Sequence, residues 1–394
     1  MNLVYVSPHF PPNALRFCVE LRRLGVNVLG IADEAYDRLQ PELWDALGEY
    51  YRVSDLHDYE QVLRACGHFT HRHGKIDRVE SHNEHWLATD ARLRADFNAF
   101  GLGPAELADI QHKARMKERL RRAGVPVARG GVAGTIADGR RLASETGYPL
   151  IAKPEVGVGA GGTFRIEDDR QLAAFFADRP RVDYLLEEFI PGRLFSFDGL
   201  TDREGRIVFH TAHFFSRGIM EAVNADEDLF YYSLREIPAD LEEVGRKAVA
   251  AFDLRERFFH FEVFRTLRDD RIVALEMNAR PPGGLTTDMF NYASDIDVYR
   301  GWASLVAHDR FTAPGVRKYH CCYVGRKNRK RYAHGHEEIL ARFGRLIPHH
   351  AAIDGAFRAA IGDHGYLARS PDLEEILEVA RFIQETAADA GRAG

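Results

Sequence analysis

The chain of 394 residues has little cysteine and no large excess of charge of either sign. A net charge of −6 and a pI near 6.3 argue against a protein that binds nucleic acid or a membrane surface. No apolar run reaches the length that a transmembrane helix needs, so we expect no membrane contact. The composition, 45% apolar and 11% aromatic, predicts a globular enzyme or binding protein rather than a disordered chain.

The four cysteines form neither a CxxC pair nor a disulfide framework, as is usual in a reducing compartment. Met1 is followed at once by "NLVYVS", without the basic segment and cleavage site of a secretory signal. We therefore expect a cytoplasmic protein.

Lysine is scarce, because only eight of the 53 cationic residues are lysines. Where arginine is the usual cation, a lysine can mark a site that needs a compact ammonium group on a flexible stem. Chance retention on the surface explains most of them. The eight are Lys75, Lys113, Lys117, Lys153, Lys247, Lys318, Lys327 and Lys330.

The first 110 residues alternate between strand and helix patterns. Residues 2–7, 13–25 and 26–33 read as strand, amphipathic helix and strand, and a third strand is expected within 75–81. Such alternation predicts a parallel sheet covered by helices. The loop after the first strand has no G-x-G-x-x-G, so we predict no dinucleotide site there.

From residue 111 the pattern changes to α+β. A basic helix over 112–124 precedes two strands around a glycine loop, and residues 194–215 read as an antiparallel pair. The glycine loop, "GVGAGG", contains Gly157, Gly159, Gly161 and Gly162 and follows Lys153 closely. Glycines let backbone N–H groups approach a polyanion, so the loop is a candidate phosphate site. A flexible hairpin tip is the alternative.

The stretch "HFEVFRTLRDDRIVALEMNARPPGG" places acids within two strand patterns. Glu276, Asn278 and Arg280 alternate along one strand and so share a face, while Glu262 lies on the preceding strand. Carboxylate and amide oxygens that converge in this way suit Mg²⁺ beside phosphates. A solvated strand face is the alternative, but the rigid "RPPGG" that follows favours a site.

Four motifs together resemble the ATP-grasp superfamily: "HKARM…LRRAGVPVARG", "YPLIAKPEVGVGAGG", "LLEEFIPG" and "HFEVF…LEMNARPPGG". The chain looks most like carboxylate–amine ligases of the amino-acid and dipeptide ligase type, related to biotin carboxylase and carbamoyl-phosphate synthetase. The resemblance implies an N-terminal Rossmann-like domain over 1–110 and an ATP-grasp domain over 111–310. A small lid over roughly 125–190 and a larger antiparallel-sheet lobe, completed by 311–394, would form the rest.

The same resemblance implies roles for individual residues. ATP would be bound by Lys113, Lys153, Gly157, Gly159, Gly161 and Gly162, and by the hinge Glu187, Glu188, Phe189 and Ile190. Mg²⁺ or Mn²⁺ would be held by Glu262, Glu276 and Asn278. Arg280 and Lys153 would be catalytic, with Arg280 steadying the acyl phosphate. The acid that often follows the hinge to bind ribose is absent, since the sequence reads "GRLFSFD" there, and Asp198 is not assigned to that role.

Candidates for substrate contact are Arg280, Gly283, Gly284, His213, Glu84 and His9. Glu84 follows the third predicted strand, where it could meet the amine substrate or cap the next helix. His213 could bind the carboxylate substrate or be a core histidine, and His9 has a similar ambiguity. The histidines at 68, 71 and 73, and at 334 and 336, have no cysteine or H-E-x-x-H context. We interpret them as surface or hydrogen-bonded positions rather than metal ligands.

These features predict an ATP- and Mg²⁺-dependent ligase that activates a small carboxylate, joins it to an amine and releases ADP and phosphate. One alternative is bicarbonate activation by a carboxylase or carbamoyl-type enzyme, although the chain lacks an A-M-K-M biotinylation segment and an evident glutaminase region. The other is a nucleotide-binding regulator without turnover. The resemblance is also compatible with a homodimer.

Overall fold

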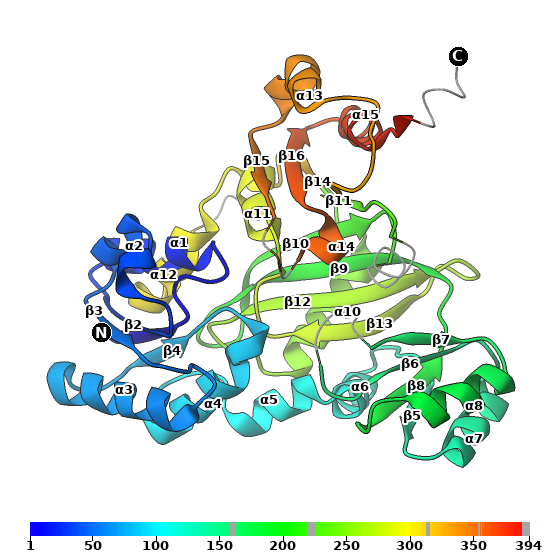
Figure 1. Cartoon of the computed structure of the whole chain (residues 1–394), viewed down its shortest axis with the longest axis horizontal. Helices are drawn as coiled ribbons and strands as arrows, with labels where there is room; N and C mark the ends of the chain where they lie inside the picture. Colours follow the sequence, from blue (N-terminus) through cyan, green and yellow to red (C-terminus); the bar gives the residue numbers. More distant parts are fainter. Residues whose placement is uncertain (158–161, 219–225, 313–315, 354, 356, 388–394) are drawn as a thin grey trace.

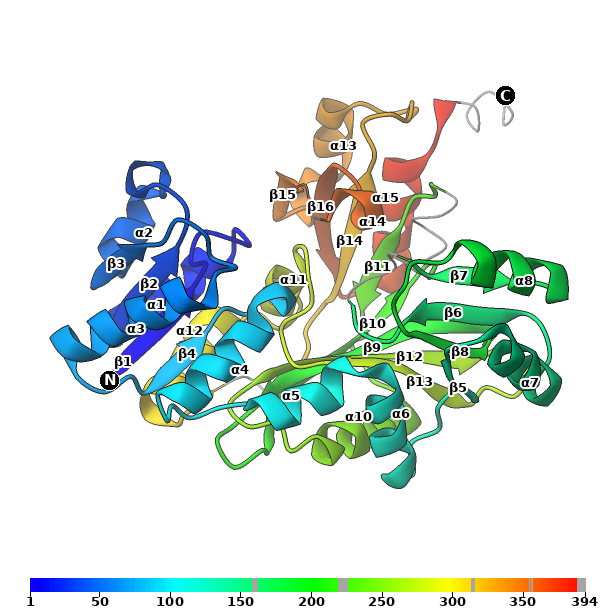
Figure 2. The ribbon, with the colours of Figure 1, turned by 60° about the horizontal axis from the view of Figure 1, so that its bottom comes forward.

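A computed structural model of the chain describes residues 1–157, 162–218, 226–312, 316–353, 355 and 357–387. Within them the named strands form three sheets, with four, eight and four strands. We call the N-terminal sheet A, the large sheet B and the remaining small one C. Sheets A and C lie at opposite ends of the molecule with sheet B between them (Figures 1 and 2). None of the helices in the described ranges is long and apolar enough to cross a membrane.

Sheet A is parallel, with the strand order β3-β2-β1-β4. Its strands are β1 (Asn2–Val6), β2 (Asn27–Ala32), β3 (Glu49–Arg52) and β4 (Arg78–Glu80). Both faces of β1 and β2 are buried, which explains their nearly continuous apolar sequences. The accompanying helices are α1 (Ala14–Arg23), α2 (Pro41–Ala46), α3 (Tyr59–His73), α4 (Leu87–Asp96) and α5 (Pro104–Gln111).

β3 is a strand that the sequence pattern does not predict. It lies at the edge of sheet A, and its four residues are half-buried or exposed, so no apolar alternation marks it. The strand expected within 75–81 is β4, which pairs with β1 on the other side.

Helix α12 (Val298–His308) returns from late in the chain to pack on α1. Phe17 of α1 meets Tyr299 and Trp302 of α12 edge to face, with ring centroids 4.8 and 5.3 Å apart. Buried aromatic pairs of this geometry stabilise beyond their area alone. Sheet A is therefore held by residues far from it in sequence.

Sheet C is antiparallel, in the order β5-β8-β6-β7. Its strands are β5 (Gly130–Ala133), β6 (Leu150–Pro154), β7 (Phe164–Ile166) and β8 (Tyr184–Glu188). Helices α7 (Ile136–Thr146) and α8 (Asp169–Asp178) accompany it. Thr135 and Asp138 form a capping box that begins α7 at the point where β5 has ended.

Sheet B is antiparallel throughout, in the order β13-β12-β9-β10-β11-β14-β16-β15. Its strands are β9 (Gly192–Thr201), β10 (Ile207–Phe215), β11 (Phe230–Ser233), β12 (Phe258–Thr266), β13 (Ile272–Asn278), β14 (His320–Arg326), β15 (His349–Ala352) and β16 (His364–Ser370). The C-terminal strands thus continue the same sheet. The helices around it are α6 (Lys113–Arg122), α10 (Ala239–Ala251), α11 (Thr286–Ser294), α13 (His336–Phe343), α14 (Arg358–Ile361) and α15 (Leu373–Gln384). Short 3-10 helices are η1 (Tyr36–Arg38), η2 (Glu84–Trp86) and η3 (Gly344–Leu346).

A buried ionic cluster joins sheet A to sheet B. Arg257, just before β12, donates to the Glu80 carboxylate of β4 over 2.6 Å and to the Ala279 carbonyl over 3.1 Å. Arg94 donates to the same carboxylate over 3.3 Å, and all three charged side chains are buried. Because Ala279 lies between Asn278 and Arg280, this cluster positions the end of β13.

We expect Arg257→Met to lower the free energy of unfolding by about 3–5 kcal/mol, because it leaves the buried Glu80 carboxylate with one cationic partner fewer. Chemical denaturation would measure the loss. The matched control is Arg255→Met, since Arg255 is exposed and pairs with the exposed Asp253. That change should cost less than about 1 kcal/mol. Equal effects of the two substitutions would contradict the structural role of the cluster.

Candidate active site

One cavity between sheets B and C contains most of the residues that the sequence singles out. Its wall combines α6, the end of β6, the hinge after β8, and the faces of β12 and β13. The sequence-predicted residues that line it are Lys113, Lys153, Gly157, Glu187, Glu188, Phe189, Ile190, Glu262, Glu276, Asn278 and Arg280. The fold therefore brings the predicted phosphate, hinge and acidic groups to a single place.

Helix α6 presents two lysines to this cavity. Lys113, Met116, Lys117 and Leu120 form its buried side, at the spacing of one helix face. Met116 and Leu120 pack into the main core, while both lysines line the cavity. The Glu155 carboxylate accepts the backbone N–H of Ala114 over 3.1 Å, an acid at the helix N-terminus where negative charge is favourable.

The Glu187 carboxylate lies between two ammonium groups. Lys117 Nζ is 2.6 Å from Oε2 and Lys153 Nζ is 2.5 Å from Oε1, and all three side chains are buried. Burial alone would raise the pKa of Glu187, but the two lysines outweigh it and lower the pKa to about 2. Burial lowers the pKa of Lys117 to about 8. The group carries net positive charge when both lysines are protonated, which favours a bound phosphate.

Lys117 is a cavity residue that sequence reasoning did not assign. The signal was present, because Lys117 is one of the eight lysines and follows Lys113 by one helical turn. Lysines on a solvated helix surface have the same spacing. Only the packing of α6 against the core shows that Lys117 is a cavity residue rather than a surface residue.

The hinge residues line the cavity, but their carboxylates are already engaged. Glu187 holds the lysine pair, and Glu188 accepts from the Arg129 backbone N–H and guanidinium over 2.8 and 2.6 Å. Phe189 donates its backbone N–H to Pro149 over 3.1 Å. Contact with an adenine would therefore fall to hinge backbone and to the side chains of Phe189 and Ile190.

Glu262, Glu276 and Asn278, which we call the acidic row, lie on the paired strands β12 and β13. Glu262 lies directly opposite Glu276, and His260 lies opposite Asn278. The register shifts between Glu262 and Val263, and such bulges commonly re-aim side chains beside sites. Burial raises the pKa of Glu276, and the nearby Glu262 raises it further. Two facing carboxylates with an amide oxygen fit a divalent cation, which would relieve this repulsion.

His260 is a second cavity residue that sequence reasoning did not assign. Its Nδ1 lies 2.5 Å from Asp198 Oδ1, and its Nε2 lies 3.5 Å from Glu262 Oε1. Burial alone would lower the pKa of His260, but the Asp198 and Glu262 carboxylates raise it to about 9. A protonated His260 donates to Asp198 and orients toward the acidic row. Asp198 is fully buried, so it is not placed to bind ribose.

Arg280, which lines the cavity, is paired with Glu84. Its Nε donates to Glu84 Oε2 over 3.0 Å, which joins the end of β13 to the segment after β4. Glu84 does not cap η2, because the Asn83 side chain accepts the His85 N–H instead. Glu84 therefore contacts Arg280 rather than capping η2, and its contact with an amine substrate stays a prediction.

The glycine loop is described only at its two ends. Gly157 accepts a hydrogen bond from Lys113 Nζ over 2.9 Å at its carbonyl, so the loop begins beside the lysines. Gly162 has a φ of +72° next to Pro154. Gly159 and Gly161 lie outside the described residues.

The remaining substrate-side candidates lie in different surroundings. Gly283 and Gly284 follow Arg280 and pack beneath Phe357 and Ile361, where a Cβ would lie 2.7 and 2.6 Å from those side chains. His213 is fully buried, with Nδ1 2.7 Å from Asp198 Oδ2, which favours its interpretation as a core histidine. His9 lies in the loop after β1 with a partly buried ring, and burial lowers its pKa.

Residues 146–288, which include much of the cavity wall, match the model of the ATP-grasp domain, so this part of the chain is similar to that family. Among curated proteins, the chain is similar to the L-arginine-specific L-amino acid ligase of Bacillus subtilis, at 25% identity over 235 residues. It is also similar to the 2-oxoglutarate carboxylase small subunit of Hydrogenobacter thermophilus, at 30% identity over 139 residues.

Solved structures extend the likeness in fold over nearly the whole chain. The L-amino acid ligase from Bacillus licheniformis superposes with a TM-score of 0.73 at 18% identity, covering 96% of each chain. The biotin carboxylase domain dimer of the Hydrogenobacter thermophilus 2-oxoglutarate carboxylase, in complex with MgADP and bicarbonate, gives 0.71 at 18% identity, covering 96% and 88%.

The sequence alignments are shorter than the structural ones. The Bacillus subtilis alignment covers 57% of this chain and 56% of the ligase, so the chain spans about half the length of that relative. The carboxylase alignment covers 32% of this chain and 29% of the subunit.

Proposed function

We propose that the protein is an ATP- and Mg²⁺-dependent ligase that activates an amino acid or another small acid as an acyl phosphate and joins it to an amine. ADP and phosphate are the other products. The observation that carries this proposal is that one cavity contains three lysines, the Glu262–Glu276–Asn278 row and Arg280. Similarity to amino acid ligases supports the choice of a carboxylate and an amine as substrates.

The cationic side of the cavity would bind the nucleotide phosphates. Lys113 and Lys153 face them, and Lys117 holds Glu187 in place so that Lys153 stays fixed. Glu262, Glu276 and Asn278 would hold Mg²⁺, which supplies charge neutralisation at the phosphate oxygens. Fixed charges of this kind act without reorganising during the reaction.

The acyl-transfer half of the reaction would take place next to Arg280. The substrate carboxylate oxygen takes the γ-phosphoryl group and ADP leaves; the amine then attacks the acyl carbon and phosphate leaves as the amine loses a proton. Arg280 is placed to stabilise negative charge on the acyl phosphate and on the tetrahedral intermediate. Glu84, held 3.0 Å from it, would orient Arg280 and could receive the ammonium form of the amine.

Bicarbonate activation is the second candidate, because a carboxylase is also among the relatives and neighbours in fold. It would use the same lysines, acids and arginine, with bicarbonate as the carboxylate. We place it second because it would need a biotinylated partner or an ammonia source in addition to this chain.

Two further features belong to the proposal. All four cysteines are free and buried, which suits the cytoplasm. A homodimer is also proposed, since one neighbour in fold was crystallised as a domain dimer.

Incubation with Mg·ATP, hydroxylamine and single carboxylic acids should give hydroxamate with at least one acid of a panel of amino acids and small acids. Hydroxylamine traps an acyl phosphate, so the product reports carboxylate activation whatever the natural amine. Colour with ferric ion measures the hydroxamate, and the matched blanks omit ATP or the acid. ATP hydrolysis that depends on bicarbonate, with a blank acid panel, would favour the second candidate. Nucleotide binding without either activity would favour a regulator.

A further inference from the structure

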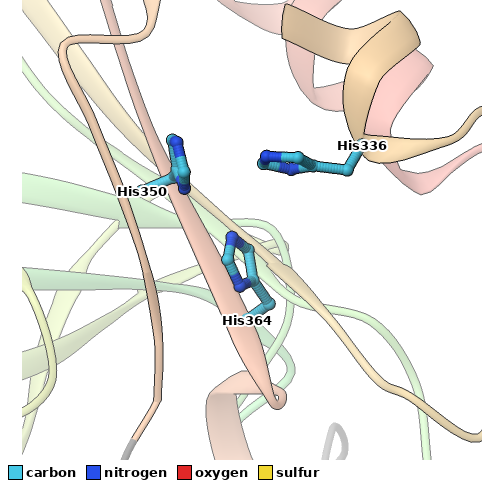
Figure 3. A group of neighbouring side chains, drawn as sticks. All are labelled: His336, His350 and His364. Atoms are coloured by element: carbon cyan, nitrogen blue, oxygen red, sulfur yellow. The ribbon is translucent and has the colours of Figure 1, made fainter.

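Three histidines of the C-terminal segment, one from a helix and two from strands of sheet B, converge on one point (Figure 3). His336 begins α13, His350 lies in β15 and His364 opens β16. One ring nitrogen from each lies within 4.8 Å of the others. The ring centroids are 4.8 Å apart for His336 and His350, and 5.5 Å apart for His350 and His364.

The surroundings of these histidines differ from those of the other histidine groups. His68 and His73 each bind the Glu49 carboxylate, at 2.6 Å. His334 similarly contacts Glu338 and Glu385, at 2.8 and 3.1 Å. Those contacts agree with the interpretation of His68, His73 and His334 as hydrogen-bonded positions, whereas His336, which the sequence groups with His334, lies instead beside His350 and His364. A carboxylate partner occupies a ring nitrogen that a metal ion would need.

In the three-histidine group no carboxylate of the described residues contacts a ring nitrogen of His336 or His364. His336 uses Nδ1 with the Tyr366 hydroxyl at 2.8 Å, which leaves Nε2 toward the group. His364 Nε2 is buried and, within the described part of the chain, has no hydrogen-bond partner. Burial lowers the pKa of His364, and the neighbouring His350, His336 and Arg326 lower it further. The geometry therefore leaves a ring nitrogen of His336 and a ring nitrogen of His364 for a metal ion.

We propose that His336, His350 and His364 bind a divalent transition-metal ion of the zinc type at a site separate from the acidic row. Imidazole nitrogens suit Zn²⁺, Co²⁺, Ni²⁺ and Cu²⁺, whereas Mg²⁺ and Ca²⁺ require oxygen ligands. A tetrahedral ion with metal–nitrogen bonds of about 2.0 Å needs ligand nitrogens about 3.3 Å apart. Small side-chain rotations would bring the three ring nitrogens from within 4.8 Å of one another to this separation. The exposed His350 leaves the fourth position open to water.

Such an ion would brace the outer edge of sheet B. It would tie the start of α13 to both strands of the β15–β16 hairpin, and the Tyr366 hydroxyl would orient His336. The segment that connects these strands includes Phe357 and Ile361, which cover Gly283 and Gly284 beside the cavity. Arg326 adds a positive charge nearby, so we expect weaker binding than at a site flanked by carboxylates.

Titration of the full chain with Co²⁺ tests the site. The protein should carry no affinity tag and be freed of metal by a chelator, and excess Mg²⁺ should be present to fill the acidic row. We expect one equivalent of Co²⁺ to give the visible absorption of a four-coordinate nitrogen-bound ion, and Zn²⁺ to displace it. His350→Gln and His364→Gln should each weaken binding at least about tenfold. His71→Gln is the matched control, because His71 is an exposed histidine of α3.

Each contrary result has a definite meaning. Binding in His350→Gln and His364→Gln equal to that of the unchanged protein would overturn the proposal, as would the absence of a one-to-one complex. A cobalt signal that is lost in Glu276→Gln but kept in both histidine variants would place the ion in the acidic row, and would also overturn it. Because His350 is exposed, its replacement should leave metal-free melting and nucleotide binding unchanged. The outcome of the cobalt titration does not depend on which carboxylate the proposed enzyme activates.

Discussion

Replacement of Glu276 by glutamine should reduce ATP-dependent hydroxamate formation by about 10²–10³-fold while leaving nucleotide binding within about tenfold. The substitution preserves shape and hydrogen bonding but removes one of two charges that face each other across β12 and β13. The lysines and the hinge, which lie on the other walls of the cavity, are untouched. Hydroxamate yield and nucleotide titration of the same sample measure the two effects separately.

The stability of this variant distinguishes a metal ligand from a structural acid. Burial and Glu262 raise the pKa of Glu276 above its value in the unfolded chain, so at neutral pH its ionisation opposes folding. Glutamine removes that cost, and melting without Mg²⁺ should stay equal or rise. Glu243→Gln is the control, since Glu243 is exposed and pairs only on the helix surface with Lys247. Full activity in Glu276→Gln would refute the metal assignment.

Replacement of Lys153 by methionine should weaken ATP binding by about 10–100-fold and bring turnover to the background. Lys153 is buried in β6, 2.5 Å from Glu187, and it lines the cavity beside Lys113 and Lys117. Methionine keeps the length of the side chain but removes the charge that a phosphate would meet. Isothermal titration with ATP and with adenosine separates the phosphate contact from the adenine contact.

Adenosine binding should fall less than ATP binding in Lys153→Met, because Glu187 of the hinge keeps Lys117 as its second cationic partner. Lys247→Met serves as the matched control. Lys247 is the exposed partner of Glu243, whose replacement is the control for Glu276→Gln. Equal losses for ATP and adenosine would mean that Lys153 supports the fold of sheet C rather than the phosphates. A Lys117→Met variant should lie between the control and Lys153→Met, since Lys117 acts through Glu187.

The similarity to known proteins does not by itself choose between a ligase and a carboxylase. The chain resembles both in fold at 18% identity, and a shared fold does not define the chemistry. The identity of the carboxylate that the proposed enzyme activates would decide between them, and the hydroxamate panel tests it.

Much of the fold could be predicted because local signals agree with it. The apolar strands of sheet A, the glycine and proline that follow α6, and the turn between β9 and β10 are each visible in the sequence. The edge strand β3 could not be predicted, because its half-exposed residues have no periodic pattern. The packing of α12 on α1 could not be predicted either, because it depends on contacts between segments that are distant in the sequence.

The sequence alone determined the chemical types present at the site. Alternation along residues 276–280 put Glu276, Asn278 and Arg280 on one face, and the motif order assigned the lysines and hinge. The alternation is a short-range property of a strand, so spacing reveals it, whereas the roles of the lysines and the hinge are implied by the family resemblance.

Only the tertiary structure decided the partners. It placed Glu187 between Lys117 and Lys153, joined Glu84 to Arg280, and enclosed Asp198 with His213 and His260. It also gathered His336, His350 and His364 from three elements. The physical reason is that a buried charge needs a partner at about 3 Å, and the chain supplies that partner from whichever segment the packing of the sheets brings near.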